Sequence, residues 1–362
     1  MTAPALRLPA RARILVVALR RLGDVLLTTP LIRSLRRAWP DATIEILVFA
    51  DTAGILDGNP DIDRVIAIPA RPTLRQSLAY AAALLKRYHL AVSTQSGDRP
   101  TGFALLAGRT HIGPTWPGNR IKRFLLGRSV PAGEGVHRVE EMLRIADVLG
   151  IARVADVVAP AGASPPAVTD AAAYAVIHAA PKFRYKQWTR EGWRSLAEAL
   201  TRRGLAVVAT GGPDERGYLD ELWRDAPAVR RLDGCLTWPE LAALLARASV
   251  YVGPDTSVTH LAAASGCPTV ALFGPTDPRL WGPWPAQGLD TPSEAPWAAA
   301  GTIQRRGNVW LVQNPLPCLP CQQEGCDRHL QSHARCLDEL TPRQVLTAVD
   351  QALARQSEMV AP

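Results

Sequence analysis

The stretch ILVVALRRLGDVLLTTP, residues 14–30, decides the class of fold. Its apolar run 14–19 predicts a buried strand, and a short basic turn leads from this strand into a helix over 25–38. A strand, a turn and a helix in this order form the opening βα unit of many nucleotide-binding α/β proteins. The segment therefore predicts a parallel sheet that starts near the beginning of the chain.

The turn after this strand does not have the residues of a phosphate loop. It lacks both G-x-G-x-x-G and G-K-[ST], whose glycines let a backbone approach a phosphate. It contains Arg20, Arg21, a single Gly23 and one carboxylate, Asp24. An aspartate at the start of a helix is typical of an N-cap. The residues alone therefore leave Asp24 open between capping the helix and taking part in chemistry.

The rest of the first half continues the alternation of strands and helices. Apolar runs that do not alternate with polar residues are typical of parallel strands covered on both faces. We predict such strands at 43–48, 64–68 and 90–93, and helices at 73–88 and 136–149.

The pattern restarts after a segment rich in Ala, Pro, Gly and Ser. We predict an α/β protein with two Rossmann-like domains that face each other across a cleft. The predicted bounds are 1–160 for the first domain, 161–172 for a linker, 173–340 for the second domain and 341–362 for a C-terminal helix.

The charge of the chain favours partners that carry phosphate groups. Its 362 residues include 41 Lys and Arg against 33 Asp and Glu, a formal net charge of +8. The basic residues are scattered and not interleaved with aromatic ones, which argues against a nucleic-acid partner. No apolar run approaches the roughly 18 residues of a membrane span. The run 14–19 is too short for the core of a signal peptide, so we expect a cytoplasmic protein.

A second informative segment is VYVGPDTSVTHLAAASGCPTVALFGPTDP, residues 250–278. Here a predicted strand ends in a Gly-Pro turn, and a helix opens at Thr256. The free backbone N–H groups of its first turn, with the hydroxyls of Thr256 and Ser257, suit a diphosphate, and His260 lies one turn further along. The alternative is that Asp255 only caps the helix and that His260 belongs to the core.

Several segments together resemble glycosyltransferase family 9, the ADP-heptose:lipopolysaccharide heptosyltransferases. In order along nearly the whole chain, they are RRLGDVLLTTPLIRSLRRAWPDA, GNPDIDRV, HAAPKFRYKQW, TGGPDE, the segment 250–278 and a cysteine-containing tail. The resemblance implies the GT-B fold, with the acceptor on the N-terminal domain and the nucleotide sugar on the C-terminal one. The chain departs from the family at Ala180-Pro181, where many members carry hydroxyl residues.

The resemblance also implies roles for individual residues. Asp24 matches the candidate catalytic base of the family, which would take a proton from the acceptor hydroxyl. Lys186, in YKQW, matches a lysine that would act in catalysis by neutralising the leaving diphosphate. The nucleotide-sugar site would contain Lys186, Gly211, Leu236, Asp255, Thr256, Ser257 and His260.

On the acceptor side, the candidates are basic residues that could bind phosphate or carboxylate groups: Arg20, Arg21 and Arg120. Asp61 and Asp63 form a D-x-D spacing, which holds a metal in another glycosyltransferase fold. Here the spacing lies in the first half, directly before a predicted strand, and indicates a turn. We therefore expect that catalysis requires no metal and no other cofactor.

The tail 317–337 contains four of the six cysteines: Cys318, Cys321, Cys326 and Cys336. Four thiolates in one loop suit a structural zinc or iron ion. Since disulfides are disfavoured in the cytosol, the alternatives are a metal or reduced thiols. The spacing C-x2-C-x4-C-x9-C differs from the paired C-x2-C arrangement of ordinary zinc sites. Members of the resembled family often carry this cluster, which implies a structural knuckle.

The leading hypothesis is an inverting glycosyltransferase that moves heptose from ADP-heptose onto the lipopolysaccharide inner core. Because the acceptor is a lipid, we expect peripheral contact with the cytoplasmic face of the inner membrane. The segments LRRLGDVLLTTP, YKQW and WGPW resemble the branch that adds the later core heptoses. The alternatives are a family 9 enzyme with another glycan or protein acceptor, a non-catalytic nucleotide-sugar-binding protein, and a dinucleotide oxidoreductase, which the missing glycine fingerprint disfavours.

Overall fold

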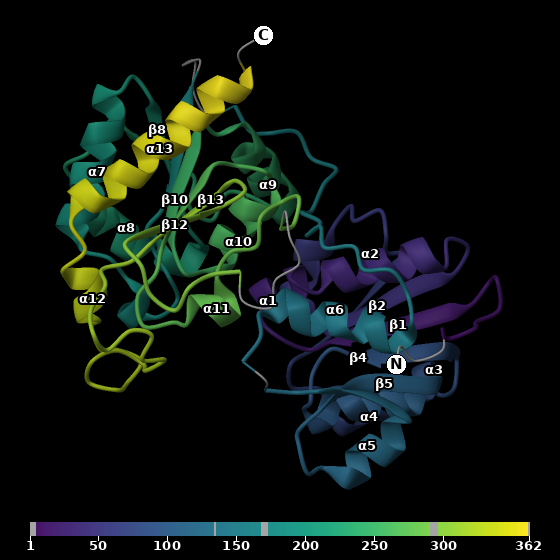
Figure 1. Cartoon of the computed structure of the whole chain (residues 1–362). Coiled ribbons are helices and arrows are strands. Elements are labelled where there is room, and N and C mark those ends of the chain that lie inside the picture. The colour runs from purple at the N-terminus through teal and green to yellow at the C-terminus, as the bar shows by residue number, and fades with distance from the viewer. Residues whose placement is uncertain (1–4, 134, 168–172, 290–295, 361–362) are drawn as a thin grey trace. The chain divides into compact units, whose positions relative to one another are not determined.

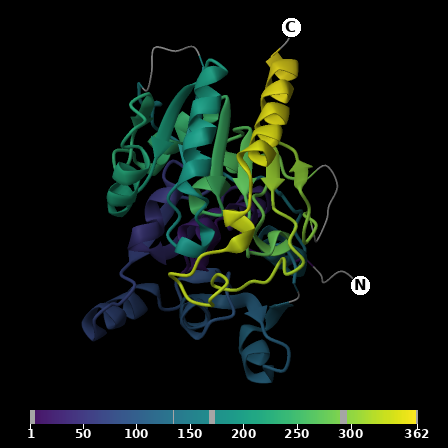
Figure 2. The ribbon, with the colours of Figure 1, turned by 90° about the vertical axis from the view of Figure 1, so that its left-hand side faces the viewer.

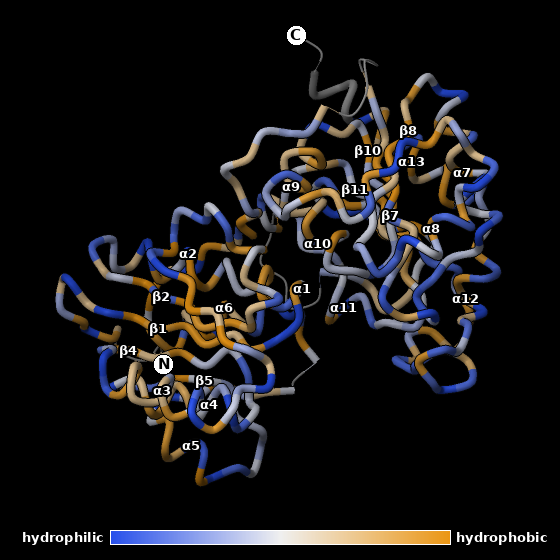
Figure 3. Tube along the Cα trace, turned by 180° about the vertical axis from the view of Figure 1, so that it is seen from behind, coloured by the Kyte–Doolittle hydropathy of each residue, from blue (hydrophilic) through white to orange (hydrophobic). Residues whose placement is uncertain are grey.

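The computed structural model describes residues 5–133, 135–167, 173–289 and 296–360. The chain divides into two compact units, Met1–Pro160 and Ala161–Pro362, and each is an α/β structure built on one sheet (Figure 1). The strands in the middle of each unit are strongly hydrophobic (Figure 3), as strands covered on both faces must be. In the described part of the chain, no helix combines the length and the apolar character needed to cross a membrane.

The first unit contains a six-stranded parallel sheet in the order β3-β2-β1-β4-β5-β6. The order reverses between β1 and β4, and ligands of open α/β sheets bind outside the carboxyl ends of strands at such a point. The strands are β1 (Arg13–Ala18), β2 (Thr43–Phe49), β3 (Arg64–Ile68), β4 (Tyr88–Ser93), β5 (Gly108–Thr115) and β6 (Arg128–Pro131).

Helices cover both faces of this sheet. Figure 1 shows α2 and α6 on one side and α3, α4 and α5 on the other. The bounds are α1 (Leu22–Leu26), α2 (Thr29–Ala38), the 3-10 helix η1 (Ala50–Leu56), α3 (Leu74–Leu84), α4 (Asp98–Ala107), α5 (Arg120–Leu126) and α6 (Arg138–Leu149).

The helix predicted over 25–38 consists of two helices in the structure. The helix is interrupted between Leu26, the last residue of α1, and Thr29, the first residue of α2. Pro30 occupies the first turn of α2, where its missing N–H costs no hydrogen bond. The helix predicted over 73–88 ends at Leu84, and Tyr88 already belongs to β4. The prediction missed α4, β5, α5 and β6 entirely.

The second unit contains a seven-stranded sheet in the order β12-β13-β11-β10-β7-β8-β9. Among the described strands of this sheet, only β12 and β13 pair in antiparallel fashion. Its order reverses between β7 and β10. The strands are β7 (Tyr174–His178), β8 (Ala206–Thr210), β9 (Val229–Arg231), β10 (Val250–Pro254), β11 (Thr269–Leu272), β12 (Ile303–Arg306) and β13 (Val309–Val312).

The C-terminal helix α13 (Pro342–Val360) belongs to the core of this unit. It lies beside α7 (Figure 2), and its Val345 and Val349 are fully buried in one cluster with Trp193. The other helices of the unit are η2 (Arg184–Lys186), α7 (Arg190–Arg202), η3 (Pro213–Glu215), α8 (Arg216–Leu222), α9 (Trp238–Arg247), α10 (Ser257–Ala264), α11 (Pro278–Trp281) and α12 (Arg335–Asp338).

Candidate functional site

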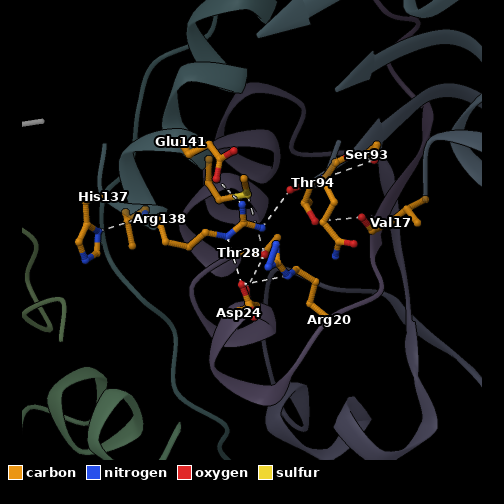
Figure 4. A network of polar contacts seen from close by, with 12 residues as sticks. Val17, Arg20, Asp24, Thr28, Ser93, Thr94, His137, Arg138 and Glu141 are labelled. Atoms are coloured by element: carbon orange, nitrogen blue, oxygen red, sulfur yellow. Dashed lines mark hydrogen bonds and ion pairs between the residues drawn. The ribbon is translucent and has the colours of Figure 1, made fainter. Parts of the chain in front are cut away.

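The first unit holds a buried carboxylate where its strand order reverses. Asp24 lies on α1, directly after β1, and is 8% exposed. Its Oδ1 lies 3.4 Å from Nε of Arg20 and 3.6 Å from Nε of Arg138 (Figure 4). The carboxylate is therefore held between two guanidinium groups, one from the preceding turn and one from α6.

Arg138 is the more deeply buried of these two cations, with 4% of its side chain exposed. Its Nη2 donates a hydrogen bond of 2.9 Å to the carbonyl oxygen of Thr94, which directly follows β4, and its Nη1 pairs with Glu141. Arg138 thus connects the start of α6 to α1 and to the end of β4. No pattern in the sequence near position 138 indicates a partner on α1, so this residue was not among the candidates.

The structure rules out the capping role for Asp24. The helix α1 begins at Leu22, so its N-cap is Arg21, and no side-chain hydrogen bond caps this helix. Asp24 lies within the first turn, where the partial positive charge of the helix favours an anion. A buried carboxylate that caps nothing, at the reversal point of the sheet, is a candidate for chemistry.

The basic candidates of the first unit do not all lie together. The side chain of Arg20 is 42% exposed beside Asp24, and Arg21 is exposed next to it in sequence. Arg120 is exposed at the start of α5, which follows β5, and none of its described contacts is with Asp24.

The D-x-D spacing is a turn before β3, as expected. Asp61 pairs with Arg33 at 2.8 Å, and Asp63 pairs with Arg36 at 2.6 Å. Both arginines lie on α2, so these carboxylates fasten the loop to the helix.

The second unit has an ion pair at its own reversal point. Lys186, in η2 after β7, pairs through Nζ with Oδ2 of Asp255, which directly follows β10 and is 8% exposed. Burial alone would raise the pKa of the Asp255 carboxyl, but Lys186, His260 and the hydroxyl of Thr276 hold this pKa below its ordinary value. Asp255 is therefore an anion that keeps the Lys186 ammonium at the edge of the sheet.

The residues after Asp255 form the start of a helix. Thr256 is the N-cap of α10, and its Oγ1 accepts a hydrogen bond of 3.4 Å from the backbone N of Thr259. Asp255 is therefore not the cap, and the capping part of that alternative is wrong. Ser257 begins the helix, and His260, 6% exposed, lies one turn along it. The helix N-terminus and Lys186 are both suited to a diphosphate group.

Gly211 and Leu236 lie near each other at the neighbouring strand. Gly211 follows β8, and its carbonyl accepts a hydrogen bond of 2.8 Å from Gly234, two residues before the half-buried Leu236. A Cβ on Gly211 would lie 2.5 Å from Cδ1 of Leu219, so a side chain would force a shift here. Because residue 211 is a glycine, no side chain of its own covers the backbone at the end of β8.

His178 is a second residue that the sequence did not indicate. It ends β7 at the same edge of the sheet, and its Nδ1 lies 3.3 Å from Oγ1 of Thr210. Burial lowers the pKa of His178 to about 4, so its imidazole is neutral near pH 7. It supplies a polar group without charge one strand away from Asp255.

The four tail cysteines lie near each other without forming a metal-binding group. Burial and, to a smaller extent, its three cysteine neighbours raise the pKa of Cys336 to about 12. Cys318 and Cys326 are exposed. Among the described residues, which include the whole tail, no three or more His, Cys, Asp or Glu side chains are placed to hold a metal. The predicted metal-ligand set is therefore not assembled in this structure.

The comparisons with known proteins agree on one group. The model described as "Glycosyltransferase family 9 (heptosyltransferase)" matches residues 154–294. "Lipopolysaccharide heptosyltransferase 3" of Escherichia coli is 32% identical over 286 residues, which cover 72% of this chain and 83% of that relative. The chain is therefore a glycosyltransferase with the two Rossmann-like domains of the GT-B fold. It belongs to glycosyltransferase family 9.

Solved structures show the same fold. The E. coli ADP-heptose lipopolysaccharide heptosyltransferase II has a TM-score of 0.72 at 20% identity, covering 95% of this chain and 99% of that one. The dodecameric, iron-containing glycosyltransferase TibC of enterotoxigenic E. coli has a TM-score of 0.57 at 18% identity, covering 97% of this chain and 78% of that one. At these identities the likeness concerns the fold alone.

Proposed function

We propose that the protein transfers heptose, with inversion, from ADP-heptose to the inner core of a lipopolysaccharide. The observation that carries the proposal is that each unit has functional groups of a different kind at the point where its strand order reverses. The first unit offers a buried carboxylate, Asp24, and the second offers Lys186 beside the N-terminus of α10. The identity with an E. coli lipopolysaccharide heptosyltransferase supports this choice of sugar and acceptor.

In the proposed reaction, Asp24 is the general base. It takes the proton of the acceptor hydroxyl while that oxygen attacks the anomeric carbon of the heptose. The bond from this carbon to the diphosphate oxygen breaks on the opposite face, so the configuration inverts and ADP leaves with the electron pair. Arg20 and Arg138 hold the base in place through their ion pairs.

The second unit stabilises the leaving group in this proposal. Lys186, the N–H groups of α10 and the hydroxyls of Thr256 and Ser257 face the charge that develops on the diphosphate. With these donors, the proposed step needs no catalytic metal. Gly211 and Leu236 border the nucleoside end, and Arg20, Arg21 and Arg120 are the proposed contacts of the acceptor's anionic groups. Because the acceptor is a lipid, the protein would work at the cytoplasmic face of the inner membrane.

The experiment that tests the proposal is ADP release from ADP-heptose in the presence of heptose-deficient lipopolysaccharide. We expect release by the wild type and a rate at least about a hundredfold lower for Asp24→Asn, with ADP-heptose binding retained. The matched control is Asp61→Asn, since Asp61 is also a buried carboxylate paired with an arginine of the first unit. If the wild type does not bind ADP-heptose, the proposed donor is wrong. If it binds ADP-heptose but releases no ADP, the proposed acceptor is wrong.

A further inference from the structure

The charges of the chain are distributed unevenly. Residues 64–133, from the start of β3 to two residues past β6, contain 11 Lys and Arg against one acid, Asp98. All remaining residues contain 30 Lys and Arg against 32 Asp and Glu, when these are subtracted from the totals of 41 and 33. The surplus of positive charge therefore comes from one part of the first unit.

The same part of the chain carries the exposed apolar side chains. Among the described residues, eight large hydrophobic side chains are exposed, and seven of them lie between positions 74 and 125. We call these seven the α3–α5 surface, since they lie on α3 and α5 or next to them: Leu74, Leu78, Leu85, Trp116, Ile121, Phe124 and Leu125. Figure 1 places both helices on the same side of the sheet, opposite to α2 and α6.

The helix α5 presents its apolar side to solvent. Ile121 and Phe124 are 76% and 85% exposed, and with Leu125 they lie at the i, i+3 and i+4 positions of one helix face. Its Lys122, in contrast, faces the protein and donates hydrogen bonds of 2.6 Å to the carbonyl of Ser96 and 2.8 Å to Asp98. Because α5 directs Lys122 towards the protein and exposes Phe124 to solvent, this helix face is suited to contact with an apolar partner.

The charge selects among the partners that could cover this surface. A second copy would bring the same basic segment against itself, and like charges across an interface oppose association. A bilayer with anionic headgroups offers both requirements, an apolar interior for the side chains and phosphates for the arginines between them. In α5 one of these arginines, Arg123, is exposed and lies directly before the exposed Phe124.

We propose that the α3–α5 surface docks the protein on a phospholipid bilayer that carries anionic headgroups. Ile121 and Phe124 enter the boundary between headgroups and acyl chains, and exposed basic residues of the segment 64–133 such as Arg123 contact the headgroup phosphates. The proposal deepens the proposed function, on which it rests for its purpose, because a lipid-linked acceptor is presented at such a surface. The binding itself requires neither donor nor acceptor.

The test is co-sedimentation of the full chain with vesicles that contain no lipopolysaccharide. We expect binding to vesicles of phosphatidylcholine mixed with phosphatidylglycerol, weaker binding to phosphatidylcholine alone, and a decrease as salt is added. The double variant Ile121→Ser with Phe124→Ser should bind the mixed vesicles at least about tenfold more weakly than the wild type. It lacks the two apolar side chains that are proposed to enter the bilayer. Leu330→Ser, which changes an exposed leucine of the second unit, is the matched control and should bind like the wild type.

Three results would overturn the docking proposal: no binding to mixed vesicles, equal binding to both kinds of vesicle, or unchanged binding of the double variant. An oligomer in sedimentation velocity that the double substitution dissociates, without any vesicle binding, would assign the surface to a second copy instead. ADP release with a lipid-free oligosaccharide acceptor should be unchanged in the double variant. That assay separates a failure of docking from a failure of the proposed activity.

Discussion

Arg138 is the residue on which the arrangement around Asp24 depends most. Arg138→Met would remove one of the two described cationic partners of Asp24 and a described partner of Glu141. Because breaking a buried ion pair leaves an uncompensated charge, we expect a loss of about 3–5 kcal/mol in the free energy of unfolding. Urea unfolding of the purified variants measures this loss.

The control for that prediction is Arg202→Met. Arg202 pairs with Glu198 on α7, and 69% and 70% of the two side chains are exposed. Solvent screens such a pair, so we expect this variant to lose about 1 kcal/mol or less. Equal losses in both variants would mean that burial of Arg138 has no energetic consequence.

His178 gives the second unit a stability that depends on pH. Its pKa is lowered from 6.5 to about 4 by burial, so between these values the unfolded chain binds a proton that the folded chain does not. The contribution of the neutral imidazole is complete above pH 6.5 and is lost as the pH falls towards 4. We expect a loss of about 2 kcal/mol by pH 5, which His178→Gln should remove. Urea unfolding of both proteins at pH 7 and pH 5 checks this, and an equal pH dependence would contradict it.

Some of the candidate residues could be selected from the sequence because their positions depend on local patterns. Asp24, Lys186 and Asp255 each follow a strand, and the turn after a parallel strand reaches the ligand-binding edge of the sheet. Arg138 could not be found in this way, because its link with Asp24 exists only once α6 packs against the sheet. The capping role of Asp255 was wrong by one residue, since Thr256 caps α10.

At the scale of elements, two glycines a few residues apart should respond in opposite directions to alanine. A Cβ on Gly108, the first residue of β5, would lie 2.7 Å from both Cβ of Ala91 and the carbonyl oxygen of Thr110. We therefore expect Gly108→Ala to destabilise the protein by about 1–3 kcal/mol. Gly102 lies within α4 with nothing within 4 Å of such a Cβ, so Gly102→Ala should stabilise by about 0.5–1 kcal/mol.

Thermal unfolding of the two alanine variants beside the wild type measures both changes. A destabilised Gly102→Ala would contradict the expected gain from a less flexible unfolded chain. An unchanged Gly108→Ala would show that β4 and β5 can separate without cost.

The elements that the sequence predicted are those with uniformly apolar strands. The strands β1 and β2 are buried along almost their whole length and were found in place. In contrast, β5 has the sequence GRTHIGPT and is the second strand from the edge of its sheet. Its polar residues and its proline do not form the uniformly apolar run by which strands were predicted. The helix α5 was missed because its apolar face points to solvent, so no core partner explains its pattern. A helix whose apolar residues are exposed is difficult to predict from a pattern that assumes that apolar residues are buried.

At the scale of the molecule, both units repeat one strand order. The first reads β3-β2-β1-β4-β5-β6, and the second reads β9-β8-β7-β10-β11-β13 with β12 added at the edge. The sequence predicted two Rossmann-like halves because the alternation of strands and helices restarts at the second half. The pairing order itself depends on right-handed crossovers, which follow from the twist of the strands rather than from any local motif.

This division makes a prediction about ADP. If the second unit alone binds the nucleotide, ADP should stabilise that unit by mass action, by about 2.7 kcal/mol at a concentration of 100 times its Kd. Hydrogen–deuterium exchange should then slow at the start of α10 and around η2, and remain unchanged at α1. Lys186→Met should remove most of the effect, because it deletes the cation proposed to face the diphosphate. Lys182→Met, an exposed lysine of the same loop, should keep it. Equal protection in the two variants would assign ADP binding to groups other than the Lys186 ammonium, and protection of α1 as strong as that of α10 would assign the nucleotide to both units.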